Sequence, residues 1–287
     1  MSATRDGRGR AVLGTVLRTP TGAFGVAVVS ILVAASVIGA VWTPFDPQAT
    51  DPEHAWLLPF QGGHLLGTDR VGRDQFSLLV AAARQTLAVA VGTAVFSGIL
   101  GGTLALIVAL TPRPLAAAVV QLIDVVIAIP TILLAMVLTA MYGPSTTIVI
   151  VALGVSFSVV VSRVVRAELA GALAADYVLA ARAAGARTAR IIRRHALPAV
   201  APTLVVQLSL VAALAVLAEA ALSYLGYGAS PSTPSWGGIL HEQQAYITAR
   251  PMLVVWPGLA VALTVLGLNL LGDSIRDAID PRGTHTR

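Results

Sequence analysis

The sequence contains no cysteine and no lysine, and these two absences exclude several kinds of chemistry. Without cysteine, the chain can form neither a disulfide nor a thiolate metal site. A P-loop needs the lysine of its Gly-Lys-Ser/Thr segment to bind phosphate, so this chain is not itself a P-loop ATPase. Its five histidines lack the i, i+3 or i+4 pairing of a helical metal site, and we expect no bound metal.

Charged residues are also scarce, at 11% of the 287 residues, whereas hydrophobic residues make up 56% and the mean hydropathy is +0.82. Because so few charges cannot cover a soluble globule of this size, lipid is the expected solvent. A membrane span needs about 20 mostly apolar residues. Six stretches qualify: Phe24–Trp42, Thr86–Leu110, Leu115–Met141, Thr146–Ser162, Ala199–Leu222 and Pro251–Gly272. We therefore predict an all-α integral membrane protein with six transmembrane helices, kinked at Pro130 and Pro257.

The placement of arginine sets the orientation of these spans. With the N-terminus inside, Arg70, Arg73, Arg84 and Arg250 lie outside and the other 15 of the 19 arginines lie inside. Both termini are therefore expected to be cytoplasmic. The first apolar run is longer than the core of a signal peptide, which favours an uncleaved first span.

The expected organisation has five parts. They are a cytoplasmic tail (1–22), a first transmembrane helix (23–42), an extracytoplasmic loop (43–85), a five-helix core (86–273) and a cytoplasmic tail (274–287). The core includes a cytoplasmic loop (163–198) and an extracytoplasmic loop (223–250). Because function concentrates in long ordered loops, these connections are the first places to search for sites.

The cytoplasmic loop is predicted to form two short amphipathic helices that meet at Gly185. The segment Ala167–Ala184 is rich in helix formers, and an apolar stripe runs along it through Leu169, Leu173, Tyr177, Ala180 or Ala181, and Ala184. Gly185 then fits a helix-ending position, and Pro198 fits a turn into the next span. Arginines surround the small-residue face.

Two interpretations of this loop stay open on composition. Basic amphipathic helices commonly lie on a membrane, with arginines on the lipid phosphates. Alternatively, the alanine-lined face docks against a cytosolic protein, because it buries little apolar area but permits close approach of the backbones.

Five positions in this loop resemble the EAA loop of binding-protein-dependent ABC importer permeases: Ala180, Ala181, Gly185, Leu197 and Pro198. Two positions depart from that pattern, since Leu179 replaces the acidic residue and His195 replaces the usual isoleucine.

Four further segments resemble the same family, and within it the C-type permease of dipeptide, oligopeptide and nickel importers. They are His64–Leu87, which contains the GTD-x-x-GRD signature, Asp124–Ala135, the pair Glu219–Gly228 and Pro234–Leu240, and Trp256–Arg282. The resemblance implies a type I ABC importer permease fold in a bacterial inner membrane. It also implies a second homologous permease, cytosolic ATPase subunits that bind ATP and Mg, and an extracellular solute-binding lipoprotein.

The resemblance implies that this chain takes part in transport and is not an enzyme. It also implies that the chain has no cofactor of its own and binds no nucleic acid. Peptides are the expected substrates, and nickel is the alternative. A secondary transporter is a more distant alternative, and it would predict internal inverted repeats that the sequence does not display. A membrane-embedded enzyme would require clustered polar groups within the spans, and none is visible.

Three sets of candidate site residues follow. The ATPase-coupling set is Asp176, Tyr177, Ala180, Ala181, Ala184, Gly185, Leu197 and Pro198. The set for contact with the binding protein, or for a gate, is Gly67, Thr68, Asp69, Gly72, Arg73 and Asp74. The pathway candidates are Glu219 and Gln207, and both a pathway and a structural role stay open for Glu219.

Other polar and aromatic residues are given structural roles. Asp124 and Asn269 are interpreted as links between helices. The set Asp69, Arg70, Arg73 and Asp74 has an equally weighted alternative, in which these residues only neutralise one another within an ordered plug. We expect Gln75–Arg84 to form a helix lying at the outer interface, and Tyr224, Tyr227, Trp236 and Tyr246 to form an interfacial belt.

Overall fold

The computed structural model describes residues 14–230 and 232–279 and is helical throughout, apart from loops and two isolated β-bridges within that part of the chain. The helices are α2 (Pro20–Val41), α3 (Gln75–Leu110), α4 (Arg113–Ile127), α5 (Thr131–Tyr142), α6 (Thr146–Ala174), α7 (Asp176–Ala183), α8 (Thr188–Ile191), α9 (Leu197–Tyr224), α10 (Trp236–Gln243) and α11 (Pro251–Ile279). Short 3-10 turns lie at Pro52–His54 and Gln244–Tyr246, and a π-helical turn at Ile192–Ala196 precedes α9.

Five of the described helices are long and apolar enough to cross a membrane, and a sixth span is formed if α4 and α5 are counted as one. That pair bends by 82° between Ile127 and Thr131. Pro130 lies at the bend, where it cannot donate a backbone hydrogen bond, so a break replaces the predicted kink. Pro257, by contrast, lies inside the unbroken helix α11. The prediction of an all-α membrane protein is confirmed.

The helix α3 differs from the prediction at its N-terminal end. Instead of a separate interfacial helix at Gln75–Arg84, these ten residues are the first part of a continuous 36-residue helix. Asp74 begins the helix by accepting a hydrogen bond from the backbone N–H of Ser77, at 2.7 Å. No glycine or proline interrupts the helix before Gly92, so nothing in the sequence ends it at the membrane boundary.

The helices α3 and α6 share the most extensive helix–helix contact in the described structure. On α3, Ser97, Gly101 and Ala105 are buried at intervals of four residues. On α6, Gly154, Ser158 and Ser162 are buried at the same interval. A Cβ on Gly101 would lie 2.5 Å from the carbonyl oxygen of Ser158. Small residues therefore let these two backbones approach closely, as is typical of membrane helices.

The C-terminal end of α6 shows that the predicted single helix Ala167–Ala184 is wrong. The span continues past Ser162 to Ala174, and Ala175 then adopts an extended conformation with φ −68° and ψ 146°. Asp176 starts α7, where its negative charge suits the positive end of the helix dipole. The break shifts the buried face by one residue, so Val178 is fully buried and Tyr177 is 50% exposed.

The structure also corrects the expected turn at Pro198. Pro198 lies in the first turn of α9, and the chain from Thr188 to Tyr224 is one helical stretch. A proline ring clashes with the carbonyl four residues earlier in a regular α-helix. The π-helical turn widens the helix just before this point, and the Leu197 N–H donates to the carbonyl of Ile192, five residues back.

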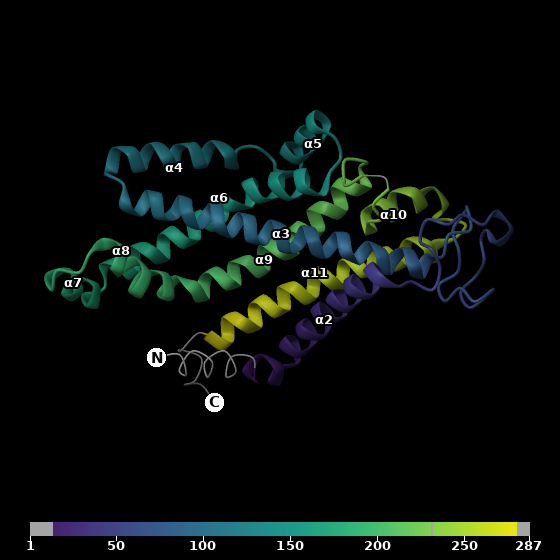
Figure 1. Ribbon diagram of the computed structural model, residues 1–287, viewed down its shortest axis with the longest axis horizontal. Helices are drawn as coiled ribbons and strands as arrows, with labels where there is room; N and C mark the ends of the chain where they lie inside the picture. Colours follow the sequence, from purple (N-terminus) through teal and green to yellow (C-terminus); the bar gives the residue numbers. More distant parts are fainter. Residues whose placement is uncertain (1–13, 231, 280–287) are drawn as a thin grey trace.

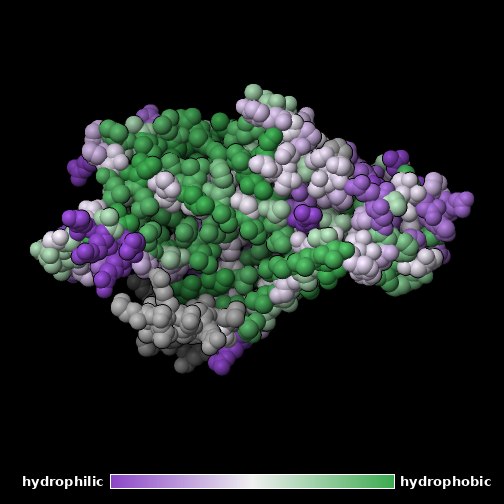
Figure 2. All heavy atoms as spheres, in the orientation of Figure 1, coloured by the Kyte–Doolittle hydropathy of each residue, from purple (hydrophilic) through white to green (hydrophobic). Residues whose placement is uncertain are grey.

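The two ends of the bundle are distinct (Figure 1). One end carries α7 and α8 together with the beginning of α2 and the end of α11. The loop 43–74 and α10 lie toward the opposite end. Figure 2 shows hydrophilic residues gathered at both ends and a broad hydrophobic band between them, which is the surface expected of a membrane-spanning bundle.

The α3–α6 contact gives a test of stability. Gly101→Ala is expected to lower the free energy of unfolding by about 1 to 3 kcal/mol, because the added methyl group would collide with backbone atoms of α6. Gly102→Ala is the matched control, since no atom lies within 4 Å of its Cβ and alanine is the better helix former. Thermal denaturation in detergent compares the two. Equal stability of both variants would contradict the close packing of α3 and α6.

Candidate functional site

The first site is an elbow formed by α7 and the turn that follows it. At the end of α7, Gly185 has a φ of +78°, which glycine adopts without steric cost. Its N–H donates to the carbonyl of Arg182 at 2.9 Å, and the Ala186 N–H donates to the carbonyl of Ala181 at 3.0 Å. These two bonds form a complete Schellman motif, so Gly185 occupies the predicted C′ position.

The elbow is anchored by few apolar side chains. Val178 of α7 and Ile191 of α8 are buried. The rings of Tyr177 and His195 lie 5.6 Å apart. His195, a departure from the family pattern, therefore packs α7 against the π-helical turn.

The outward surface of α7 combines small residues with a few larger apolar side chains. Ala180 and Ala184 are exposed, Ala181 is half-buried, and Leu179 is 52% exposed. Five exposed arginines surround this surface: Arg182, Arg187, Arg190, Arg193 and Arg194. Of the predicted coupling residues, Asp176 to Gly185 therefore lie together on α7 and its C-terminal turn. Leu197 and Pro198 lie at the start of α9 and are also exposed.

The second site is a cap made by the loop 43–74 and α10 at the end of the bundle opposite the elbow, and Asp69 lies at its centre. This residue is 1% exposed, and its Oδ1 accepts hydrogen bonds from the N–H groups of Val71 and Arg73, each at 2.9 Å. The Arg73 Nε donates to Oδ2 at 2.6 Å. One carboxylate thus organises the whole GTDRVGRD turn. Because this carboxylate is buried, its negative charge needs these hydrogen-bond and ion-pair partners to offset the cost of removing it from water.

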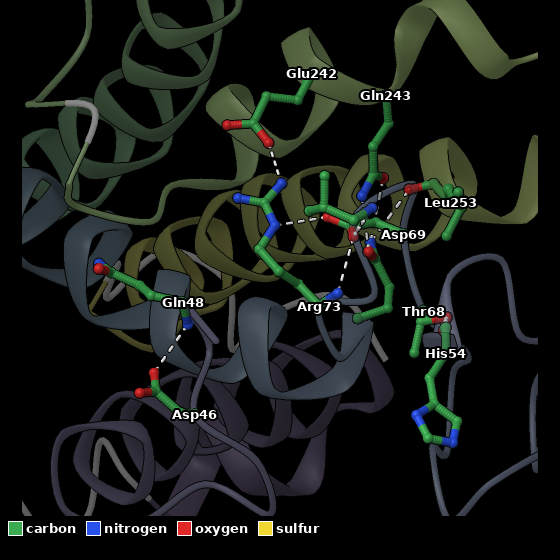
Figure 3. Close-up of polar contacts among 11 residues, drawn as sticks. Asp46, Gln48, His54, Thr68, Asp69, Arg73, Glu242, Gln243 and Leu253 are labelled. Carbon is green, nitrogen blue, oxygen red and sulfur yellow. Dashed lines mark hydrogen bonds and ion pairs between the residues drawn. The ribbon is translucent and has the colours of Figure 1, made fainter. Parts of the chain in front are cut away.

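Arg73 joins this turn to α10 by donating to Glu242 as well (Figure 3). Burial alone would lower the pKa of Arg73, but the hydrogen bonds to Glu242 and Asp69 outweigh it and raise the pKa above its usual range. Arg73 is therefore a permanent cation shared between the loop 43–74 and α10.

Two further contacts hold α10 against the start of α3. The side-chain amides of Gln75 and Gln243 are paired and buried, with Gln243 Nε2 donating to Gln75 Oε1 at 2.8 Å. The indole N–H of Trp236 donates to the carbonyl of Leu79 at 3.0 Å. Trp236 is only 5% exposed, so it does not belong to the predicted interfacial belt. Sequence analysis missed Gln75, Glu242 and Gln243, whose partners lie about 170 residues away along the chain.

The remaining cap candidates are structural supports in their present positions. The hydroxyl of Thr68 donates to the carbonyl of His54 and accepts from the Leu57 N–H at 2.9 Å. Asp74 pairs with the buried His64 at 2.9 Å. Gly67 and Gly72 have φ values of +80° and +81°.

The Asp69–Arg73 ion pair agrees with the plug hypothesis, whereas Arg70 is exposed and forms no ion pair with any described residue. Thr68, Asp69 and Asp74 are at most 2% exposed. A protein that binds to this cap would therefore not contact these three side chains directly. It would contact the surface whose shape they maintain.

The two pathway candidates do not form one site. Glu219 is 1% exposed and accepts a hydrogen bond from Ser223, one turn later in α9, at 2.7 Å. Gln207 is half-buried and lies about 18 Å from Glu219 along the axis of α9, at a rise of about 1.5 Å per residue. Asp124 pairs with Arg163 at 3.2 Å and joins α4 to α6, in agreement with its structural interpretation. The described residues contain no cluster of three metal-ligating side chains.

The helical bundle with ordered structures at both ends defines a multi-pass membrane protein. Its family follows from residues 78–285, which match the binding-protein-dependent transport system inner membrane component. The chain therefore belongs to this family of ABC importer permeases and is an inner-membrane protein, as its resemblance in sequence implied.

Several relatives are similar over nearly the whole chain. The di/tripeptide transport system permease protein DppC of Pseudomonas aeruginosa (strain UCBPP-PA14) is 36% identical over 269 residues, covering 91% of this chain and 88% of that protein. A putative peptide transport system permease of Brucella suis biovar 1 is 38% identical, with 90% and 86% covered. The nickel transport system permease NikC of Escherichia coli K12 is 33% identical, with 88% and 91% covered.

The fold has a solved counterpart. A chain of the MetNI methionine ABC transporter, in an inward-facing conformation, superposes with a TM-score of 0.60 at 22% identity. The match covers 71% of this chain and 98% of that chain. The type I importer permease fold is thus confirmed.

The cap network gives a second test. Asp69→Asn is expected to lower the free energy of opening of the loop 43–74 by about 1 to 3 kcal/mol, because it removes a buried, charge-assisted acceptor. Amide hydrogen exchange across this loop measures the opening. Glu53→Gln is the control, since Glu53 is exposed and its side chain holds nothing in the cap. A cap that exchanges equally slowly in both variants would show that Asp69 does not organise it.

Proposed function

We propose that this chain is the C-type permease subunit of an ATP-driven peptide importer. With a second, homologous permease it would form the pathway for di- and oligopeptides that an extracellular solute-binding lipoprotein delivers. Cytosolic ABC ATPase subunits would bind ATP and Mg and supply the free energy. The observation that carries the proposal is the glycine-ended elbow at one end of the bundle, opposite the ordered cap.

The elbow suits energy coupling because of its place in the chain. α7 follows directly on α6 and leads through a short turn to the helical stretch that becomes α9. A displacement of α7 would therefore act on two spans at once, as rigid-body coupling requires. The exposed Ala180 and Ala184 allow an ATPase surface to approach the backbone closely, and the arginines around them favour acidic partners.

The opposite end suits a receptor. The cap joins the loop 43–74 to α10 through the charges of Asp69, Arg73 and Glu242. A rigid surface of this kind loses little conformational entropy when a protein docks on it. We assign the cap to the extracytoplasmic side, which places the elbow and both termini in the cytoplasm.

Peptides are the proposed cargo because the relatives named for peptide transport outnumber the nickel permease among those described above. The test is to reconstitute the chain with its partner subunits in proteoliposomes. Uptake of a labelled dipeptide is expected to require both ATP and the binding protein. Accumulation of Ni²⁺ without uptake of di- or oligopeptides would favour the nickel alternative instead.

The elbow hypothesis is tested separately with Gly185→Val. Valine is strained at a φ of +78°, so the turn after α7 is expected to distort while the bundle remains folded. Peptide uptake should fall at least tenfold more than the ATPase rate. Gly171→Val is the matched control, because Gly171 also lies in open space but within helix α6. An equal loss of both activities, in a normally assembled complex, would contradict a coupling role.

A further inference from the structure

A cavity of about 580 Å³ with a mixed polar and apolar lining opens beside the C-terminal end of α2 and the N-terminal parts of α3 and α6. Its size is within the range of small-molecule sites. Residues from four separate parts of the chain line it, including Asp46, Arg84, Gln85, Thr146 and Ser232. None of these residues belongs to the candidate sets described above.

Gln85 lies in the wall of this cavity and holds an unused hydrogen-bond donor. The residue is 4% exposed, and its Oε1 accepts a hydrogen bond from the hydroxyl of Thr146 at 2.9 Å. Its Nε2 is buried and has no partner in the described structure. A buried donor of this kind costs free energy, and a solute in the cavity reaches it when the side chain turns toward the solute.

The N-terminus of α6 supplies further donors. This 29-residue helix begins at Thr146, in the wall of the cavity, and the side chain of Ser145 makes no capping hydrogen bond. The N–H groups of the first turn therefore remain available, and the helix dipole places partial positive charge there.

The cavity also carries one charge of each sign. Arg84 is exposed and forms no ion pair among the described residues. Asp46 accepts a hydrogen bond from the backbone N–H of Gln48 at 2.9 Å, and its charge is likewise unpaired in the described structure. An unpaired cation beside an orphan amide and a free helix N-terminus favours an oxyanion, whereas Asp46 favours an ammonium group.

We propose that this cavity binds a small zwitterionic solute through its free carboxylate. Arg84, the Nε2 of Gln85 and the first turn of α6 receive the carboxylate, and Asp46 receives the ammonium group. This inference rests on the proposed function, because it makes the cavity a transient binding site for transported peptides with free termini. The same positive groups disfavour a divalent metal cation there.

The test uses the complete transporter in nanodiscs of zwitterionic lipid, without the binding protein, so that the receptor's own selectivity does not enter. Titration calorimetry measures the affinity for Ala-Ala, for its C-terminal amide and for N-acetyl-Ala-Ala. The wild type is expected to prefer Ala-Ala over both derivatives. Arg84→Gln is expected to weaken Ala-Ala binding about tenfold or more and to remove the preference over the amide.

Three variants complete the experiment. Gln85→Leu is expected to weaken Ala-Ala binding by a smaller factor, and Asp46→Asn to remove the preference over N-acetyl-Ala-Ala. Arg113→Gln is the matched control, because Arg113 is an exposed arginine that does not line the cavity, and its affinities should equal those of the wild type.

The outcomes separate the site from the proposed function. Equal affinity for Ala-Ala and its amide, or an unchanged Arg84→Gln variant, would overturn the site even if peptide uptake is normal. Competition by anionic lipid, without any preference for Ala-Ala, would identify a lipid phosphate as the occupant and would also overturn it. Carboxylate-dependent binding that is lost in Arg84→Gln supports the site. If proteoliposomes then take up no peptide, only the proposed function fails.

Discussion

The close approach of α3 and α6 is the constraint on which the other features depend. Gly101 allows it, because any side chain there would collide with the α6 backbone. α3 starts at the outer cap and extends over 36 residues, and α6 leads directly into the inner elbow. A hydrophobic driving force between helices is absent in lipid, so interdigitation of small residues must supply much of this attachment. The cap and the elbow are therefore connected through one tightly packed helix pair.

Buried charges hold the cap together, whereas contacts between small residues hold the helix bundle together. Asp69 and Arg73 satisfy one another and several backbone groups, and Glu242 extends the network to α10. A buried ion pair contributes little net stability compared with apolar packing, but breaking it is costly. What such a network adds is a defined geometry, because each partner has only one arrangement that satisfies it. Two loops far apart in the sequence thus form a single surface.

The predictable parts of the structure were those determined by local sequence. The lengths of the apolar runs predicted most of the spans. The position of Gly185 was also predicted, because a positive φ directly after a helix strongly favours glycine. The break at Ala175 was not predictable, since alanine carries no signal to end a helix. Gln75 and Gln243 look like ordinary surface residues until folding brings them together. Likewise, the cavity beside Arg84 depends on segments that only the tertiary structure brings together.

The π-helical turn at Ile192–Ala196 has a consequence for the evolution of the chain. Such a turn holds one residue more than a regular helical turn, and each residue rotates an α-helix by about 100°. Deleting a single residue there would restore a regular helix but swing every downstream side chain of α9 around its axis by that angle. The lipid-facing and bundle-facing sides of the helix would then be exchanged in part. Lineages of this protein should accordingly tolerate substitutions in this stretch far better than changes in its length.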